Sequence, residues 1–121
     1  MPRFLILMAE PDHFARWDAV DEQTRERVLA DLRAFTAAAR ARGRYLGGEA
    51  LTHPRNARTL RPSGDDQQLT EGPYADTPEE LGGFYLVELP DLPTALELAS
   101  LLPREYFTEV RECLDVGVPD A

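Results

Sequence analysis

The hydrophobic pattern at the start of the chain is a continuous apolar run, without the alternation of a strand exposed on one side. Residues 4–9 are all apolar, and Pro11 bounds them. Such a short run predicts a central strand that is covered on both faces. Residues 10–20 show no clear period. We therefore expect irregular chain there, with Phe14 and Trp17 packed at the edge of the core.

The next segment has the repeat of an amphipathic helix. Asp21 is a suitable N-cap, and Gly43 supplies a stop signal, so the helix is expected to reach about Arg42. Apolar residues at helical spacing predict its buried stripe. That stripe consists of Val28, Leu32, Phe35 and Ala39.

Short strands are expected in the middle of the chain. Residues 44–51 form one, and the pair Gly47-Gly48 within it indicates a bulge or a close approach of two backbones. Residues 58–61 and 67–70 form two more. The turn-rich sequence 62–66, Pro-Ser-Gly-Asp-Asp, joins these two strands into a hairpin.

The last third of the chain predicts a second helix between two strands. Residues 77–80 carry Thr-Pro-Glu-Glu, a capping box that predicts a very short helix. A strand is expected over 83–89, and a closing strand over 109–116. Between them a helix opens at Asp91 and is ended by Pro103. Its predicted apolar side is Leu92, Ala95, Leu96, Ala99 and Leu102.

This order of elements indicates an α+β fold. We expect one domain over residues 1–121, ferredoxin-like, βαββαβ, with a small β-hairpin insertion and an antiparallel sheet that carries two helices on one face. The helices can cover one sheet face only, whereas both faces are apolar, as Phe4 and Leu5 or Tyr85 and Phe84 illustrate. A large apolar face exposed to solvent is unfavourable. We therefore predict that a second copy covers it, in a homodimer with two-fold symmetry.

Composition narrows the class of function. The chain has a formal net charge of −9, and all 13 of its basic residues are arginine. Nucleic-acid binding is disfavoured by this charge. The segments that are apolar are too short for a membrane span or a signal peptide, so a cytoplasmic location is the default expectation. The single cysteine, Cys113, excludes an internal disulfide and is expected to be a buried thiol.

The segment 71–76, Glu-Gly-Pro-Tyr-Ala-Asp, is the most unusual one in the chain. Gly72 before Pro73 restricts the backbone, which fixes the directions of Glu71 and Tyr74. One interpretation is a structural turn that leads into the next element. The other is a binding loop.

The same segment, followed by Glu79-Glu80-Leu81-Gly82-Gly83-Phe84-Tyr85-Leu86, resembles the signature of the YCII-related family in its D-G-P-F subgroup. The sequence 48–51, Gly-Glu-Ala-Leu, fits the second strand of that family. The resemblance implies a dimeric ferredoxin-like fold with a pocket beside the sheet. Most members of the subgroup have no assigned reaction. Some are encoded near extracytoplasmic-function sigma factors, and more distant relatives include a dehydrochlorinase that acts on a chlorinated aromatic.

The chain departs from this pattern in three ways. Glu71 replaces the Asp of the motif, and Tyr74 replaces its Phe. Relatives look as if they use a His–Asp pair, but here no histidine is expected on the first helix. The two histidines, His13 and His53, fall in predicted loops, where a histidine is usually solvated. The sequence alone therefore does not support the dyad.

Carboxylates and phenols remain as the candidate groups. If Glu49 faces the core, burial should raise its pKa and make it a plausible general base. Glu71 and Asp76 are candidates for a second acid. A binding role is predicted for Gly72, Pro73, Tyr74, Gly83 and Tyr85, whereas Glu80 is assigned to helix capping. No metal or cofactor is predicted, because no ligand spacing or cofactor motif is recognised.

Two functional hypotheses follow. The first is a small-molecule enzyme that runs acid/base chemistry of the lyase or isomerase type. The second is a non-catalytic ligand-binding or regulatory module. Either one requires a pocket for an unknown small molecule.

Overall fold

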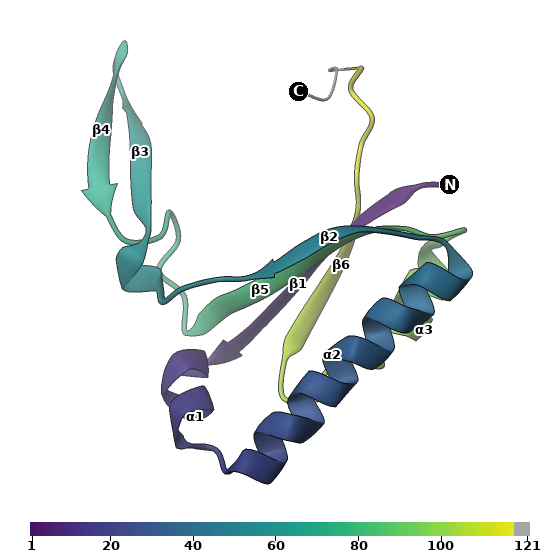
Figure 1. The fold of residues 1–121 in the computed structure, drawn as a ribbon. Coiled ribbons are helices and arrows are strands. Elements are labelled where there is room, and N and C mark those ends of the chain that lie inside the picture. Colours follow the sequence, from purple (N-terminus) through teal and green to yellow (C-terminus); the bar gives the residue numbers. More distant parts are fainter. Residues whose placement is uncertain (118–121) are drawn as a thin grey trace.

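A computed structural model of the protein describes residues 1–117, so the last four residues of the domain expected over 1–121 lie outside the described part. Its main sheet has four antiparallel strands in the order β2-β5-β1-β6. Helices α2 and α3 lie along one face of this sheet, and α1 follows the end of β1 (Figure 1). The strands are β1 (Arg3–Pro11), β2 (Arg44–Ala50), β5 (Glu79–Glu88) and β6 (Phe107–Glu112). The helices are α1 (His13–Ala19), α2 (Glu22–Arg42) and α3 (Leu92–Ala99).

Strand β1 is central, as predicted, because it pairs with β5 on one side and with β6 on the other. Its two faces differ, however. Phe4 and Ile6 are fully buried under the helices, whereas Leu5 and Leu7 on the other face are only partly covered. Within one chain, β1 is thus covered on a single face, and the expectation of cover on both faces was wrong.

Helix α2 agrees closely with its prediction. The Asp21 carboxylate accepts a hydrogen bond of 2.7 Å from the Thr24 backbone N–H, and the Gly43 N–H donates to the carbonyl of Ala39 at the other end. The capping bond holds the pKa of Asp21 below its ordinary value, first through the backbone of Thr24 and then through its hydroxyl. Of the predicted stripe, Val28, Phe35 and Ala39 are buried and Leu32 is partly buried.

Helix α3 is capped by Asp91, as expected, but it ends at Ala99 rather than at Pro103. Its buried face also differs from the predicted one. Leu92 and Leu96 are exposed, and Leu98 is buried in their place. The helix has only 8 residues, so its orientation on the sheet, more than its own apolar repeat, decides which side chains are buried.

Two local predictions were wrong. Residues 10–20 are not irregular, since they contain α1. Residues 77–80 do not start a helix: Glu79 and Glu80 begin strand β5, where they pair with Pro11 and Glu10 of β1. The ladder of β1 and β5 overrides the local capping box there, and the Thr77 hydroxyl bonds the carbonyl of Glu79 instead.

Strand β2 matches its predicted position, whereas β6 is shifted toward the N-terminus. β2 shows an irregularity between Tyr45 and Gly47, which confirms the predicted bulge. β6 starts two residues earlier than predicted and ends at Glu112, so Cys113 follows it and is exposed, not buried.

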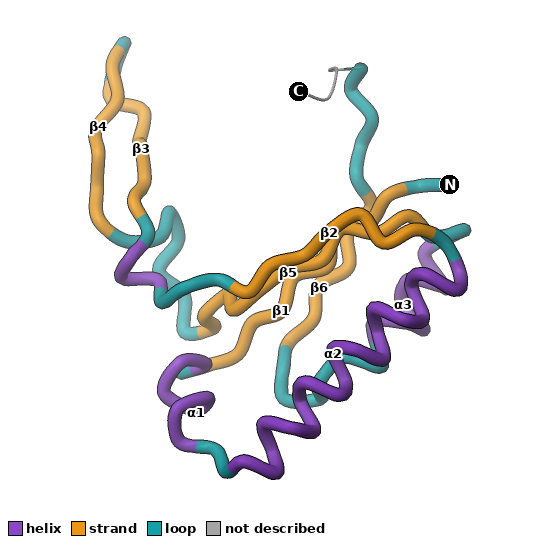
Figure 2. The backbone as a smooth tube through the Cα atoms, in the orientation of Figure 1, coloured by secondary structure: helices purple, strands orange, loops and turns teal. Residues whose placement is uncertain are grey.

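β3 (Arg58–Ser63) and β4 (Asp66–Glu71) pair with each other in a separate two-stranded sheet. A short 3₁₀ turn (Pro54–Asn56) precedes it. Figure 2 shows the hairpin standing away from the main sheet, on the side opposite to α2 and α3. Within residues 1–117, no helix has both the length and the apolar character that crossing a membrane requires.

Candidate functional site

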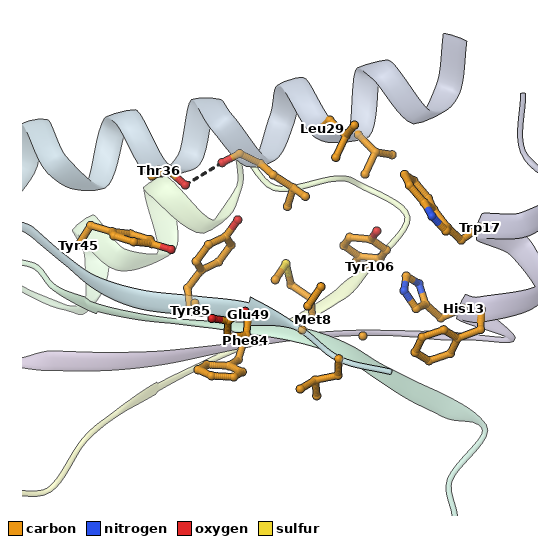
Figure 3. A pocket seen from close by; sticks show the side chains of 18 residues that line it. Met8, His13, Trp17, Leu29, Thr36, Tyr45, Glu49, Phe84, Tyr85 and Tyr106 are labelled. Atoms are coloured by element: carbon orange, nitrogen blue, oxygen red, sulfur yellow. Dashed lines mark hydrogen bonds between the residues drawn. The ribbon is translucent and has the colours of Figure 1, made fainter. Parts of the chain in front are cut away.

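A cavity of about 400 Å³ lies between the helix-covered face of the sheet and helices α1 and α2 (Figure 3). Apolar and aromatic side chains form most of its wall, and a few polar groups interrupt it. Such a composition is typical of small-molecule pockets. Side chains that border the cavity include Met8, His13, Trp17, Thr36, Tyr85 and Tyr106.

A carboxylate–imidazole pair lies at the junction of β1 and α1, and its imidazole, His13, borders the cavity. Glu10 lies near the end of β1 and is 5% exposed. His13 is the first residue of α1, and its Nδ1 lies 2.9 Å from Glu10 Oε1. Asp12, between them, has a left-handed backbone (φ 54°), which turns the chain sharply from strand to helix. This turn brings two side chains three residues apart into contact.

The pairing orients the imidazole. When Glu10 is ionised, it can only accept a hydrogen bond, so Nδ1 of His13 carries the proton and Nε2 is free to accept one. Arg16 lies 3.7 Å from the second oxygen of Glu10 and offsets part of its charge. A buried carboxylate that holds a histidine tautomer in this way is a recurring arrangement for a general base.

Gly82 of β5 makes room for this imidazole. A Cβ at position 82 would come within 2.6 Å of His13 Nε2. The ring also packs edge-on against Phe14 and Tyr106, with centroid distances of 4.8 and 5.5 Å. Gly82 therefore serves packing, because it leaves the space that the histidine occupies.

Two tyrosines add hydroxyl groups to the cavity wall. Burial raises the pKa of Tyr106 to about 12, and the negative charges of Glu10 and Glu105 act in the same direction, while Arg27 opposes them. Burial also raises the pKa of Tyr85, with a smaller opposing effect from the Thr36 hydroxyl. Both phenols stay protonated at neutral pH and can donate hydrogen bonds to a bound molecule.

Of the predicted site residues, Gly83 and Tyr85 border the cavity, and Tyr85 points toward α2 (Figure 3). Glu49 also borders it, but Glu49 is exposed and pairs in register with Phe84. The Phe84 ring lies on the sheet face away from α2. Paired residues share a face, so Glu49 lacks the burial on which its predicted role as a base depended.

The unusual loop lies elsewhere. Glu71, Gly72, Pro73, Tyr74 and Asp76 are not among the described residues that line the cavity. Tyr74 is 81% exposed. Gly72 takes a positive φ of 91°, and its N–H donates to the carbonyl of Ala57 at the base of the hairpin. The structure does not bring Glu71 and Asp76 together with Glu49.

Sequence reasoning missed the pair itself. His13 was expected in a loop, because the apolar repeat of the 7-residue helix α1 is too short to recognise. The available signal was the spacing Glu10-x-x-His13 immediately after a buried strand. His53 is not simply solvated either. Its Nδ1 accepts from the Arg55 N–H, and its Nε2 lies 3.8 Å from Glu80.

The Glu–His pair is not part of a larger ligand set. Within residues 1–117, no group of three or more His, Cys, Asp or Glu side chains is placed to hold a metal ion.

Comparison with known proteins places the chain in a family. The sequence pattern of the YCII-related domain matches residues 3–111. The chain is also 38% identical, over 74 residues, to an uncharacterised protein of Rhizobium meliloti (strain 1021). That similarity covers 61% of this chain and 60% of the relative. The chain spans less than two thirds of the length of this relative. The match over residues 3–111 shows that the protein belongs to the YCII-related family.

Proposed function

We propose that this protein binds a small organic molecule in the cavity, and that Glu10 and His13 perform acid/base chemistry on it, of the lyase or isomerase type. One observation carries the proposal: a 95%-buried carboxylate bonds Nδ1 of a histidine in the wall of a cavity of about 400 Å³. The pair replaces Glu49, Glu71 and Asp76 as the proposed acid/base groups.

The geometry supports a simple proton transfer. Nε2 of His13 accepts a proton from a C–H or O–H group of the ligand, and the Glu10 carboxylate stabilises the imidazolium that forms. The electron pair left on the ligand then either expels a leaving group, which is an elimination, or takes the proton back at another atom, which is an isomerisation. The neutral phenol of Tyr106 lies beside His13 and can donate to developing negative charge.

The lining also restricts the ligand. No arginine is among the described residues that border the cavity, although the chain has 13. A phosphate or a free carboxylate would therefore lack a cation to bind. The lining fits a ligand with an apolar body and hydrogen-bonding atoms that reach His13 at one end and the hydroxyls of Thr36 and Tyr85 at the other.

The proposal also includes the fold type, the subgroup of the family and a homodimer. The order β2-β5-β1-β6, with two helices on one face, supports a ferredoxin-like fold of one domain with the hairpin β3–β4 as an insertion. The segments 71–76 and 82–86 support membership of the D-G-P-F subgroup. The partly covered apolar face of the sheet, including Leu7 and Phe84, supports a homodimer.

A second candidate is a non-catalytic ligand-binding or regulatory module, in the sigma-factor-linked context of that subgroup. The predominantly apolar and aromatic wall favours it, because such a wall supplies affinity without chemistry. In this case the Glu10–His13 pair would fix the orientation of the ligand.

A ligand screen followed by a search for product tests the two candidates. Neutral aromatic and aliphatic compounds would be screened by the shift in melting temperature, and each hit would be incubated and analysed by mass spectrometry. We expect His13→Gln and Glu10→Gln to bind the hit and to lower turnover by about 10²–10⁴-fold. His53→Gln, outside the cavity, is the control. Product formed equally fast by His13→Gln would reject the catalytic role, and binding without product in the native protein would favour the second candidate.

A further inference from the structure

A second cavity, of about 310 Å³, lies beside the main cavity of about 400 Å³. The end of β1, helix α1, the first two turns of α2 and the chain just before β6 border it. Three side chains border both cavities and therefore form the partition between them: Trp17, Val28 and Tyr106. If this partition were opened, the two spaces would join into one longer cavity.

Among these three side chains, Trp17 is the one that a substitution can remove without disrupting the core. Val28 is 5% exposed and belongs to the buried stripe of α2, and Tyr106 packs against the His13 ring. Trp17 is only partly buried, and it lies on α1, a helix of 7 residues that buries none of them. It follows His13 by one helical turn, so both side chains lie on the cavity side of α1 (Figure 3).

Arg25 of α2 holds Trp17 in this position. Its Nη2 donates to the carbonyls of Trp17 and Asp18, at 2.9 and 3.3 Å, in the last turn of α1, where carbonyls lack partners within the helix. The same guanidinium lies over the indole, 5.3 Å from its centroid. A helix as short as α1 is marginal by itself. The place of the indole is therefore fixed from α2.

The second cavity is suited to an apolar group. Each carboxylate that borders it already pairs with an arginine of the same chain: Glu10 lies 3.7 Å from Arg16, and Glu105 pairs with Arg27. A bound group therefore has no unpaired charge to meet there. Apolar side chains make up much of the remaining wall, namely Trp17, Ala19, Val20 and Val28.

We propose that Trp17 determines the length of the ligand by closing the main cavity at its α1 end. The indole occupies the passage to the second cavity, so the apolar tail of a long ligand cannot enter that space. Truncation of Trp17 opens the passage and lets the tail leave water. This inference rests on the ligand binding proposed for the main cavity, and it adds the residue that selects among ligands of one chemical class, those with a polar head and an apolar tail.

The test uses a series of para-alkylphenols, from para-cresol to para-octylphenol, whose heads are neutral at neutral pH and whose tails grow by CH₂ groups. Dissociation constants would be measured by isothermal titration calorimetry. In the native protein we expect affinity to level off as the tail lengthens. In Trp17→Ala, the affinity for para-octylphenol relative to para-cresol should rise at least about tenfold above the native ratio, because each CH₂ that leaves water adds about fourfold.

Two further variants show where the tail goes. Leu29→Ala is the matched control, because Leu29 borders the main cavity but not the second one, and it should leave the ratio nearly unchanged. The double variant Trp17→Ala/Val20→Phe refills the second cavity and should cancel the gain. Circular dichroism would establish that the variants are folded. If Trp17→Ala does not fold, Trp17→Leu should show a smaller increase of the same sign.

Each result decides between the inference and its alternatives. An unchanged ratio in the folded Trp17 variant would overturn the role of Trp17 and leave the proposed function standing. An equal gain in Leu29→Ala, or a gain that survives Val20→Phe, would also overturn it, because a general loosening of the wall would then explain the effect. If no member of the series binds the native protein or the variant, both this inference and the proposed function are wrong.

Discussion

The two faces of the main sheet have almost the same hydrophobicity in sequence and very different surroundings in the fold. Ile6 and Val87, on the covered face, are fully buried against the helices, whereas Leu7 and Leu86, their neighbours in sequence, are only partly covered. The cavity and the Glu10–His13 pair lie on the covered face. The open face carries partly covered apolar side chains such as Leu7 and Phe84.

This difference separates the site of the proposed chemistry from the surface of the proposed homodimer. The hydrogen bond of a carboxylate is stronger in a low-dielectric environment that excludes water. Within one chain, only the covered face supplies such an environment. The open face has no comparable buried polar group among the described residues, and its exposed apolar area favours association. We therefore expect substitutions on the covered face to change stability and the histidine site, and those on the open face to change assembly.

The largest expected effect is the difference in the free energy of unfolding between the variants Ile6→Ala and Leu7→Ala. Ile6 is 0% exposed, so its truncation leaves a cavity and should lower the free energy of unfolding by about 2–5 kcal/mol. Leu7→Ala should cost about 1 kcal/mol or less in dilute protein, and should cost more only at concentrations where copies associate. Urea denaturation at two protein concentrations measures both effects. Equal losses in the two variants, independent of concentration, would remove the distinction between the faces.

A smaller effect is expected from adding one methyl group to a glycine on each face. Gly82→Ala would place its Cβ 2.6 Å from His13 Nε2, so the imidazole must move and its bond to Glu10 should weaken. Gly47→Ala is the control, because its Cβ would meet nothing within 4 Å, and Gly47 pairs with Leu86 of the open face. The imidazole signals of His13 in NMR spectra would report the change. Unchanged His13 signals in Gly82→Ala would contradict the packing described for this glycine.

The smallest expected effect is on the stability of the fold at alkaline pH. Folding raises the pKa of Tyr106 from 10.0 to about 12, so the folded state favours the neutral phenol. The stability that this contributes is complete below pH 10 and is lost as pH rises through about 12. Tyr106→Phe should therefore lose less stability than the native chain between these pH values. Tyr74→Phe, at an 81%-exposed position, is the control, and identical pH curves for Tyr106→Phe and the native chain would show that Tyr106 is not buried in this way.

The fold was largely predictable, because its signals are local and repeated. Asp21 and Gly43 bound α2 as predicted, and the turn at 62–66 joins two strands. The candidate site was less predictable. Tyr85 and Gly83 border the cavity, but Glu10 and His13 were missed because their contact depends on a left-handed Asp12 and on a helix too short to show a period. The capping box at 77–80 was misleading, because pairing with β1 is stronger than a local capping signal.

The sequence by itself determined the order of elements, the position of most strands, the capping of α2 and α3, and the resemblance to the family. These depend on interactions between residues near each other in the chain, which a pattern of side chains records directly. Only the tertiary structure decided which face of the sheet is covered and that the loop 71–76 lies apart from the cavity. It also decided that Glu10 bonds His13 and that Gly82 leaves room for the imidazole. Burial and the pairing of strands that are distant in sequence decide these features. They determine which charged side chains are buried away from water and which are exposed to it.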